Sequence, residues 1–234
     1  MYQEIEYNEI LSSNMKVYAK ERPSIPAAKP RRTEITIPGR DGALYRYEDA
    51  YDSTEITVAF NFVANEMEWM AKWRQVQRWL GARNSKLLFG DDGEVFYKIA
   101  YVDLNEIERT TARIGNFKAT FVTRDGLCYL QSGEKEYSIA DVRFNPYGIS
   151  KPIYKITGEG NCTLKVNGKS MKANVGQNLT IDTDRMLAYR EDGSIQNTAV
   201  SGNYEELYLK KGTNSLSISS GFALKIIPNW RYTP

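Results

Sequence analysis

Large apolar side chains occupy every second position in the stretch TEITVAFNFV, which covers residues 54–63. The apolar residues fall on one face of an extended chain: Ile56, Val58, Phe60 and Phe62. Successive side chains of a strand point to opposite sides, so this alternation predicts a strand with one buried face. The stretch IGNFKATFVT at residues 114–123 alternates in the same way and predicts a second strand.

The apolar period changes to that of a helix after residue 64. Asn65 suits a helix N-cap, and Glu68, three residues later, resembles the partner residue of a capping box. Gly81 is placed to end the helix. Residues at helical spacing are Met70, Trp73, Val76, Gln77 and Leu80, with Trp69 alongside. This stripe predicts a helix whose aromatic side chains face the protein core rather than a cofactor.

We expect a hairpin after the helix, from Lys86–Phe89 to Glu94–Val102. The segment Gly90–Gly93, with the sequence GDDG, joins its two strands. Asp and Gly are the residues that tight turns require, and the spacing of an EF-hand calcium loop is absent. The two aspartates therefore predict a turn and not a metal site.

Three prolines in Arg22–Arg32 disfavour a helix or a central strand and predict an extended segment that suits contact with a surface. A short strand follows at Glu34–Ile37. Pro38-Gly39 suits the central positions of a type II turn, because proline presets a negative φ and glycine allows a positive one. Asp41-Gly42 is a second turn signal.

Tyrosines then alternate with charged residues in the sequence LYRYEDAYD, where we expect an exposed aromatic loop. Exposed aromatic side chains are typical of protein interfaces, because they offer a large contact area at a low cost in entropy. Arg40 and Asp41 are interpreted as a solvated turn rather than a chemical site. The candidate contact residues are Pro38, Gly39, Arg40, Asp41, Gly42, Tyr45, Tyr47 and Tyr51.

The pattern changes after Thr123. Residues 124–145 are expected to connect two domains, and from Pro146 onwards short β patterns and turn signals recur without a helical period. Asn167-Gly168 is a strong signal for a two-residue hairpin turn. We therefore predict a mainly β protein: a β-rich domain with one helix at residues 1–135, and a small antiparallel β-sandwich at residues 136–234.

Composition excludes several classes of function. The net charge is +2 with both signs mixed along the chain, so the basic excess of a nucleic-acid-binding protein is absent. No apolar run is long enough to cross a membrane, and the N-terminus does not resemble a signal peptide. Cys128 and Cys162 have no metal or redox spacing; we expect free thiols in a reducing compartment, with a disulfide between them as the open alternative.

The sequence contains no histidine. This excludes Ser-His-Asp triads, Cys-His dyads and zinc sites with histidine ligands, so we expect no catalytic residue, cofactor or metal. An enzyme that uses paired carboxylates, such as a glycosidase, stays open. Asp182 and Asp184 in IDTD are the nearest such pair, and we expect them to end a strand.

Aromatic residues in the second domain leave a further alternative, a carbohydrate-binding module that contacts cell-wall glycans. Tyr189, Tyr204, Tyr208 and Trp230 include the side chains on which a sugar could stack, and Tyr204 and Trp230 are the candidates. A role in the core is the favoured interpretation for each of them.

The order of these segments resembles the distal tail protein, often called Dit, of long-tailed, non-contractile bacteriophages. In the first domain the resemblance rests on ERPSIPAAKPRR, on ITIPGRDGALYRYEDAYDSTEITVAFNF, on the Trp-rich helix and on WLGARNSKLLFGDDGEVFYKIAYV. In the second it rests on YKITGEGNCTLKVNGK, LTIDTD, GNYEELYLKKGTNSLSIS and the ending ALKIIPNWRY. It covers nearly the whole chain.

The resemblance implies a structural role at the tail tip of the virion, after assembly in the cytoplasm of the host bacterium. Family members form a ring, typically a hexamer, through a tail-tube-like first domain, and carry a galectin-like or carbohydrate-module-like second domain. The ring joins the tail-tube protein to tail-tip and receptor-binding proteins. The resemblance thus implies that Pro38–Tyr51 is a loop on a ring-forming scaffold.

Overall fold

The computed structural model describes residues 4–232, which divide after Cys128 into two compact units. The elements of the first unit are β1 (Ile5–Tyr7), β2 (Ile10–Leu11), β3 (Val17–Ala19), β4 (Lys29–Thr36), β5 (Ala43–Asp52), β6 (Glu55–Val63), α1 (Trp69–Leu80), β7 (Ser85–Phe89), β8 (Val95–Leu104), β9 (Glu108–Arg109) and β10 (Ile114–Leu130). The last two residues of β10 belong to the second unit.

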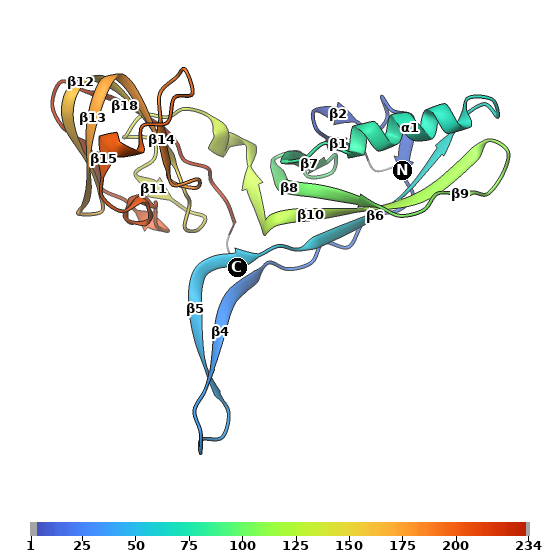
Figure 1. Cartoon of the computed structure of the whole chain (residues 1–234), viewed down its shortest axis with the longest axis horizontal. Helices are drawn as coiled ribbons and strands as arrows, with labels where there is room; N and C mark the ends of the chain where they lie inside the picture. Colours follow the sequence, from blue (N-terminus) through green and yellow to red (C-terminus); the bar gives the residue numbers. More distant parts are fainter. Residues whose placement is uncertain (1–3, 233–234) are drawn as a thin grey trace. The chain divides into compact units, whose positions relative to one another are not determined.

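One antiparallel sheet forms the body of the first unit, in the order β2-β1-β7-β8-β10-β6-β3, with β9 on β10. Helix α1 covers one face of this sheet (Figure 1). The predicted alternation of β6 is confirmed, because Ile56, Val58, Phe60 and Phe62 are all fully buried. Phe60 lies opposite Phe117 on β10, and their rings stack at 5.3 Å. The core therefore lies between this face and the helix.

Helix α1 begins later than the capping pattern predicts. Asn65 opens a turn in which the Glu68 N–H donates to the Asn65 carbonyl at 3.0 Å, and Trp69 is the first helical residue. Met70 is exposed, and the buried face consists instead of Trp69, Trp73, Val76, Trp79 and Leu80. Packing of the Trp69 ring against Phe62, at 5.5 Å, is the physical reason, since helix stability in proteins comes mainly from the packed face.

The N-terminal segment forms two short strands, β1 and β2. Asn8 and Glu9 have φ values of 53° and 61°, which make a tight turn between β1 and β2. Such turns need two residues in the left-handed region, which Asn adopts readily and Glu does not. Because Glu9 is not a typical turn residue, the sequence does not predict this turn. The predicted hairpin over residues 86–102 is confirmed as β7 and β8.

The second unit is built on a long hairpin. Strands β12 (Ile153–Val166) and β13 (Lys169–Asp182) pair along their full lengths. Asn167 and Gly168 have φ values of 50° and 81°, which confirms the predicted two-residue turn. The remaining elements of this unit are η1 (Gln131–Glu134), β11 (Phe144–Asn145), β14 (Leu187–Tyr189), η2 (Asn197–Ala199), β15 (Val200–Ser201), η3 (Tyr204–Leu207), β16 (Gly212–Thr213), β17 (Leu216–Ile218) and β18 (Ala223–Ile227).

Further strands flank this hairpin on both sides. Strands β14 and β15 pair with β13, while β17 and β18 pair with β12, and β11 pairs with β16 separately. Alternate residues of the hairpin are buried, among them Tyr154, Leu164, Met171 and Val175. The mainly β class with a single α-helix is confirmed. Within residues 4–232, no helix is long and apolar enough to cross a membrane.

Candidate interaction surface: the β4–β5 hairpin

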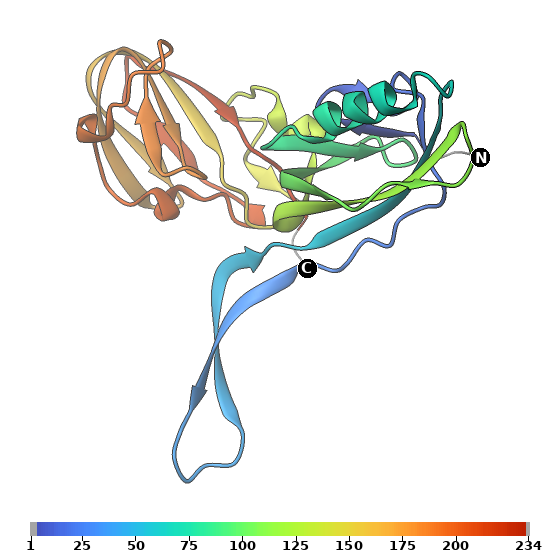
Figure 2. The same cartoon turned by 45° about the vertical axis from the view of Figure 1, so that its right-hand side comes forward.

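Strands β4 and β5 form a separate two-stranded sheet in the first unit. They pair antiparallel from Lys29 opposite Asp52 to Thr36 opposite Ala43. In both views the ribbon reaches well beyond the larger sheet of its own unit (Figure 1, Figure 2). The hairpin thus projects from the unit that carries it.

The sequence places an exposed loop where the structure has most of β5. The predicted turn at Pro38-Gly39 is confirmed: the Arg40 N–H donates to the Ile37 carbonyl at 3.2 Å, and Gly39 has a φ of 80°, as a type II turn requires. The chain is extended again from Ala43 onwards. Neither face of β5 is buried, so its sequence lacks the alternation of apolar and polar residues that predicts a strand. Aromatic and charged residues alternate there instead.

Apolar side chains on this hairpin are exposed. Every residue of β4 is exposed, and Tyr45 and Tyr47 on β5 are 49% and 65% exposed. Ile35, Ile37 and Leu44 are exposed as well. Single exposed apolar residues are common on proteins, but several on one projecting ribbon mark a surface for contact with another protein.

The two faces of the ribbon differ in chemistry. Ile35 lies opposite Leu44, which makes one face aliphatic near the tip. On the other face Tyr45 lies opposite Glu34, and the Arg32 guanidinium lies 5.3 Å from the centre of the Tyr45 ring. Tyr47 lies opposite Arg32 itself, next to a register shift that separates it from Tyr51. One face therefore offers aliphatic contacts, and the other offers aromatic and cationic ones.

Side-chain contacts within the chain stabilise the β4–β5 ribbon only weakly. The Arg31 guanidinium bonds Asp52 at 3.0 Å and the Thr33 hydroxyl bonds Glu48 at 3.3 Å, both in exposed positions. Exposed ion pairs contribute only about 0.2–1 kcal/mol each. A two-stranded hairpin without further strands or a helix is marginal in water. We therefore expect the hairpin to be more stable when the surface of another protein covers it.

The root of the hairpin is anchored by a contact that sequence reasoning misses. The Thr123 hydroxyl on β10 accepts hydrogen bonds from the N–H groups of Thr54 at 2.8 Å and Gly126 at 3.0 Å. Gly126 has a φ of 66°, and a Cβ there would lie 3.0 Å from the Asp52 carbonyl and 2.9 Å from a Thr54 methyl. A glycine within a strand is the one sequence signal for such a close backbone approach.

The candidate sugar-stacking residues of the second unit do not form an open platform. Trp230 is only 7% exposed, and its ring packs 6.2 Å from that of Tyr147. Tyr204 is half-buried, with its hydroxyl 3.4 Å from Asn197 Oδ1. Burial of Trp230 does not suit stacking, because a sugar needs a free aromatic face.

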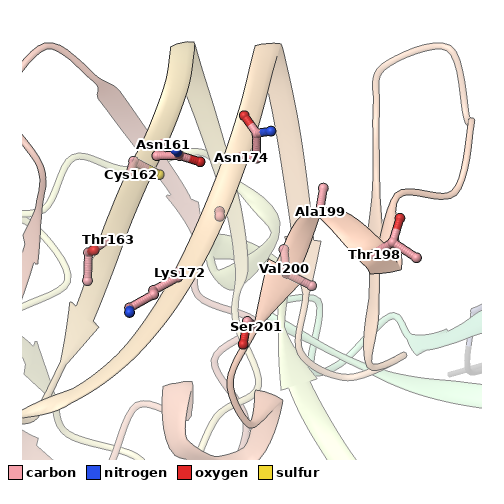
Figure 3. Close-up of a pocket in the computed structure, with 10 residues that line it drawn as sticks. Asn161, Cys162, Thr163, Lys172, Asn174, Thr198, Ala199, Val200 and Ser201 are labelled. Carbon is pink, nitrogen blue, oxygen red and sulfur yellow. The ribbon is translucent and has the colours of Figure 1, made fainter.

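A shallow pocket of about 380 Å³ does exist on this unit (Figure 3). It lies beside β12, β13 and β15, and Asn161, Asn174 and Lys172 contribute polar side chains. None of its lining residues is aromatic: Asn161, Cys162, Thr163, Lys172, Ala173, Asn174, Thr198, Ala199, Val200 and Ser201. It therefore lacks the surface on which a sugar ring stacks.

The remaining predicted chemistry is structural. Asp182 ends β13 and accepts hydrogen bonds from the N–H groups of Asp184 and Arg185, each at 3.0 Å, so this pair closes a strand as expected. Cys128 and Cys162 are free thiols, and burial raises the pKa of Cys162. Among residues 4–232, no group of acidic or cysteine side chains is arranged to hold a metal ion.

Comparison with known proteins identifies a solved structure with a similar fold. No protein-family model matches the sequence, and no curated protein matches it. Among solved structures, the Dit protein of SPP1 matches with a TM-score of 0.63 over 96% of this chain and 97% of that one, at 12% sequence identity. This chain has the fold of a phage Dit protein. The SPP1 Dit structure is described as a paradigm of the hub adsorption apparatus in phages that infect Gram-positive bacteria.

Proposed function

We propose that this chain is a structural hub protein at the distal end of a phage tail. Copies of it form a closed, hexameric ring that joins the tail-tube protein to tail-tip and receptor-binding proteins. The Dit fold over nearly the whole chain supports this role, since the similar SPP1 protein is described as part of a hub. The role needs no catalysis.

The β4–β5 hairpin is the observation that carries this proposal. A closed ring needs a head-to-tail interface, in which one patch of each copy meets a different patch of the next. A projecting ribbon with exposed apolar side chains on both faces supplies the first patch. Of the candidate contact residues, Tyr45 and Tyr47 have the most exposed rings, and the turn at Pro38–Gly42 places the tip of the ribbon.

Light scattering on a size-exclusion column tests the ring. One chain weighs 26.7 kDa. A closed hexamer weighs about 160 kDa, and we expect that mass over a range of concentrations. A monomer at every concentration would contradict a ring that this chain forms alone.

A matched pair of variants ties the mass to the hairpin. We expect Leu44→Ser combined with Tyr47→Ser to shift the mass towards that of the monomer, because the pair removes apolar contact from both faces of the ribbon. Tyr101→Ser removes a similarly exposed tyrosine from β8 and serves as the control. A ring that survives the double substitution would show that other surfaces close it.

A further inference from the structure

A second surface of the first unit has a different chemistry. A groove of about 700 Å³ lies beside α1, between the end of β6 and the turn that precedes β3. Four cationic side chains line it, together with one carboxylate, that of Glu68. The cations come from three segments of the chain: Lys16 precedes β3, Lys72 and Arg78 are on α1, and Arg113 precedes β10.

No carboxylate among residues 4–232 forms an ion pair with these cations. Lys72 donates instead to the side-chain carbonyl of Gln75 at 3.3 Å. Glu68 accepts from the Asn65 amide at 3.5 Å. Burial, and then the nearby charge of Lys16, lower the pKa of Lys72. The fold thus holds four like charges beside a single carboxylate that forms no ion pair with any of them.

Apolar side chains border the same groove. Val63 lines it and is exposed, and the small side chains of Ala64 and Ala71 line it as well. Side-chain amides of Asn14 and Gln75 add hydrogen-bonding groups. A ligand that fits this lining carries both negative charge and apolar side chains.

We propose that this groove binds an acidic peptide segment of a partner protein. Carboxylates of the segment pair with the cations, and its apolar side chains lie against Val63, Ala64 and Ala71. A peptide suits the lining better than nucleic acid, because the acidic and basic residues of the chain are nearly balanced and supply no field for a phosphate backbone. The proposal holds whether or not copies of the chain form a ring.

Fluorescence anisotropy with the whole chain tests the groove. The probe is a fluorescein-labelled peptide of repeated Glu-Glu-Leu triplets, and a Gln-Gln-Leu peptide is its neutral counterpart. We expect binding of the acidic probe that weakens as salt is added, since salt screens charges on an exposed surface. We expect Lys72→Gln combined with Arg113→Gln to weaken it about tenfold, because two ion pairs are lost.

Arg74→Gln is the matched control, because Arg74 is exposed on the same helix and does not line the groove. We expect it to change affinity less than about twofold. Thermal unfolding of each variant shows whether it is folded. Since the measurement needs only single chains, it is separate from the test of the ring.

Four outcomes would overturn the proposal. Equal binding of the neutral peptide, or binding that the double variant leaves unchanged, would show that the cations do not recognise the probe. Tighter binding of single-stranded oligothymidine would assign the groove to nucleic acid. A change in the mass of the chain in the double variant, without peptide binding, would assign the groove to contact with a second copy.

Discussion

The two long hairpins of this protein are both antiparallel and have opposite surroundings. Hairpin β12–β13 turns at Asn167-Gly168 and is flanked by further strands on both sides, with alternate side chains buried. Hairpin β4–β5 turns at Pro38-Gly39, pairs with no other strand, and exposes apolar side chains on both faces. The difference shows that one hairpin is packed within its own unit, while the other leaves apolar side chains uncovered, as the proposed contact with a neighbouring copy would require.

Truncation of one buried leucine should give the largest effect. Leu164 on β12 is fully buried, so Leu164→Ala should lower the free energy of unfolding by about 2–5 kcal/mol, because it leaves a cavity. Leu44→Ala on β5 should change the stability of the single chain by less than about 0.5 kcal/mol. Urea unfolding of dilute protein measures both. Equal costs would show that the β4–β5 hairpin is already packed.

Addition of a single methyl group at the root of the β4–β5 hairpin should give the next largest effect on stability. Gly126→Ala should cost about 1–3 kcal/mol, because φ is 66° there and the new Cβ would approach the Asp52 carbonyl at 3.0 Å. Gly93→Ala is the control, since no atom lies within 4 Å of a Cβ at that position. Thermal unfolding checks both variants, and light scattering checks whether the loosened root also weakens the ring.

Two glycines, one at the tip of each hairpin, allow a direct comparison of the same substitution in the two hairpins. Gly168 and Gly39 have φ values of 81° and 80°, and no atom lies within 4 Å of a Cβ added at either. Gly168→Ala should therefore cost about 1–2 kcal/mol of stability from backbone strain alone. Gly39→Ala carries the same strain, but its turn closes a ribbon that no core supports. We expect it to leave the unfolding curve of the single chain unchanged and to lower the mass of the assembled species.

Local patterns predict the strands and turns that local forces decide. The alternation around Phe60 and the turn at Asn167-Gly168 are both confirmed, because burial of one face or the left-handed conformation of one residue specifies each. Strand β5 is missed because neither of its faces is buried within the chain, so no apolar alternation marks it. The Thr54–Thr123 anchor joins residues 69 positions apart, a distance over which sequence periodicity carries no information.

The start of the helix shows where one local rule yields to another interaction. The Asn65–Glu68 pattern is present in the sequence, yet no side-chain cap forms, and the helix begins where Trp69 packs on Phe62. Sequence alone likewise predicts only part of the candidate interface. Tyr45 and Tyr47 are recognisable as exposed aromatics, but the aliphatic face of Ile35 and Leu44 appears only once the strand register is known.

The smallest expected effect concerns an ion pair in the supported sheet. Lys155 on β12 lies directly opposite Lys225 on β18, and Glu136 bridges the two at 2.5 and 3.1 Å. Hydrogen bonds from both lysines lower the pKa of Glu136. A carboxylate with a lowered pKa stabilises the fold above its unfolded pKa of about 4.5, and that contribution is lost as pH falls through the folded pKa.

Glu136→Gln should therefore destabilise the chain slightly at neutral pH, since it leaves two like charges facing each other across the strands. The difference from the unsubstituted chain should vanish in acid, where Glu136 is protonated. Urea midpoints at neutral pH and below pH 4 check this, with the exposed Glu205→Gln as control. A difference that persists in acid would mean that Glu136 acts through packing. The pairing of β12 with β18 would then not depend on its charge.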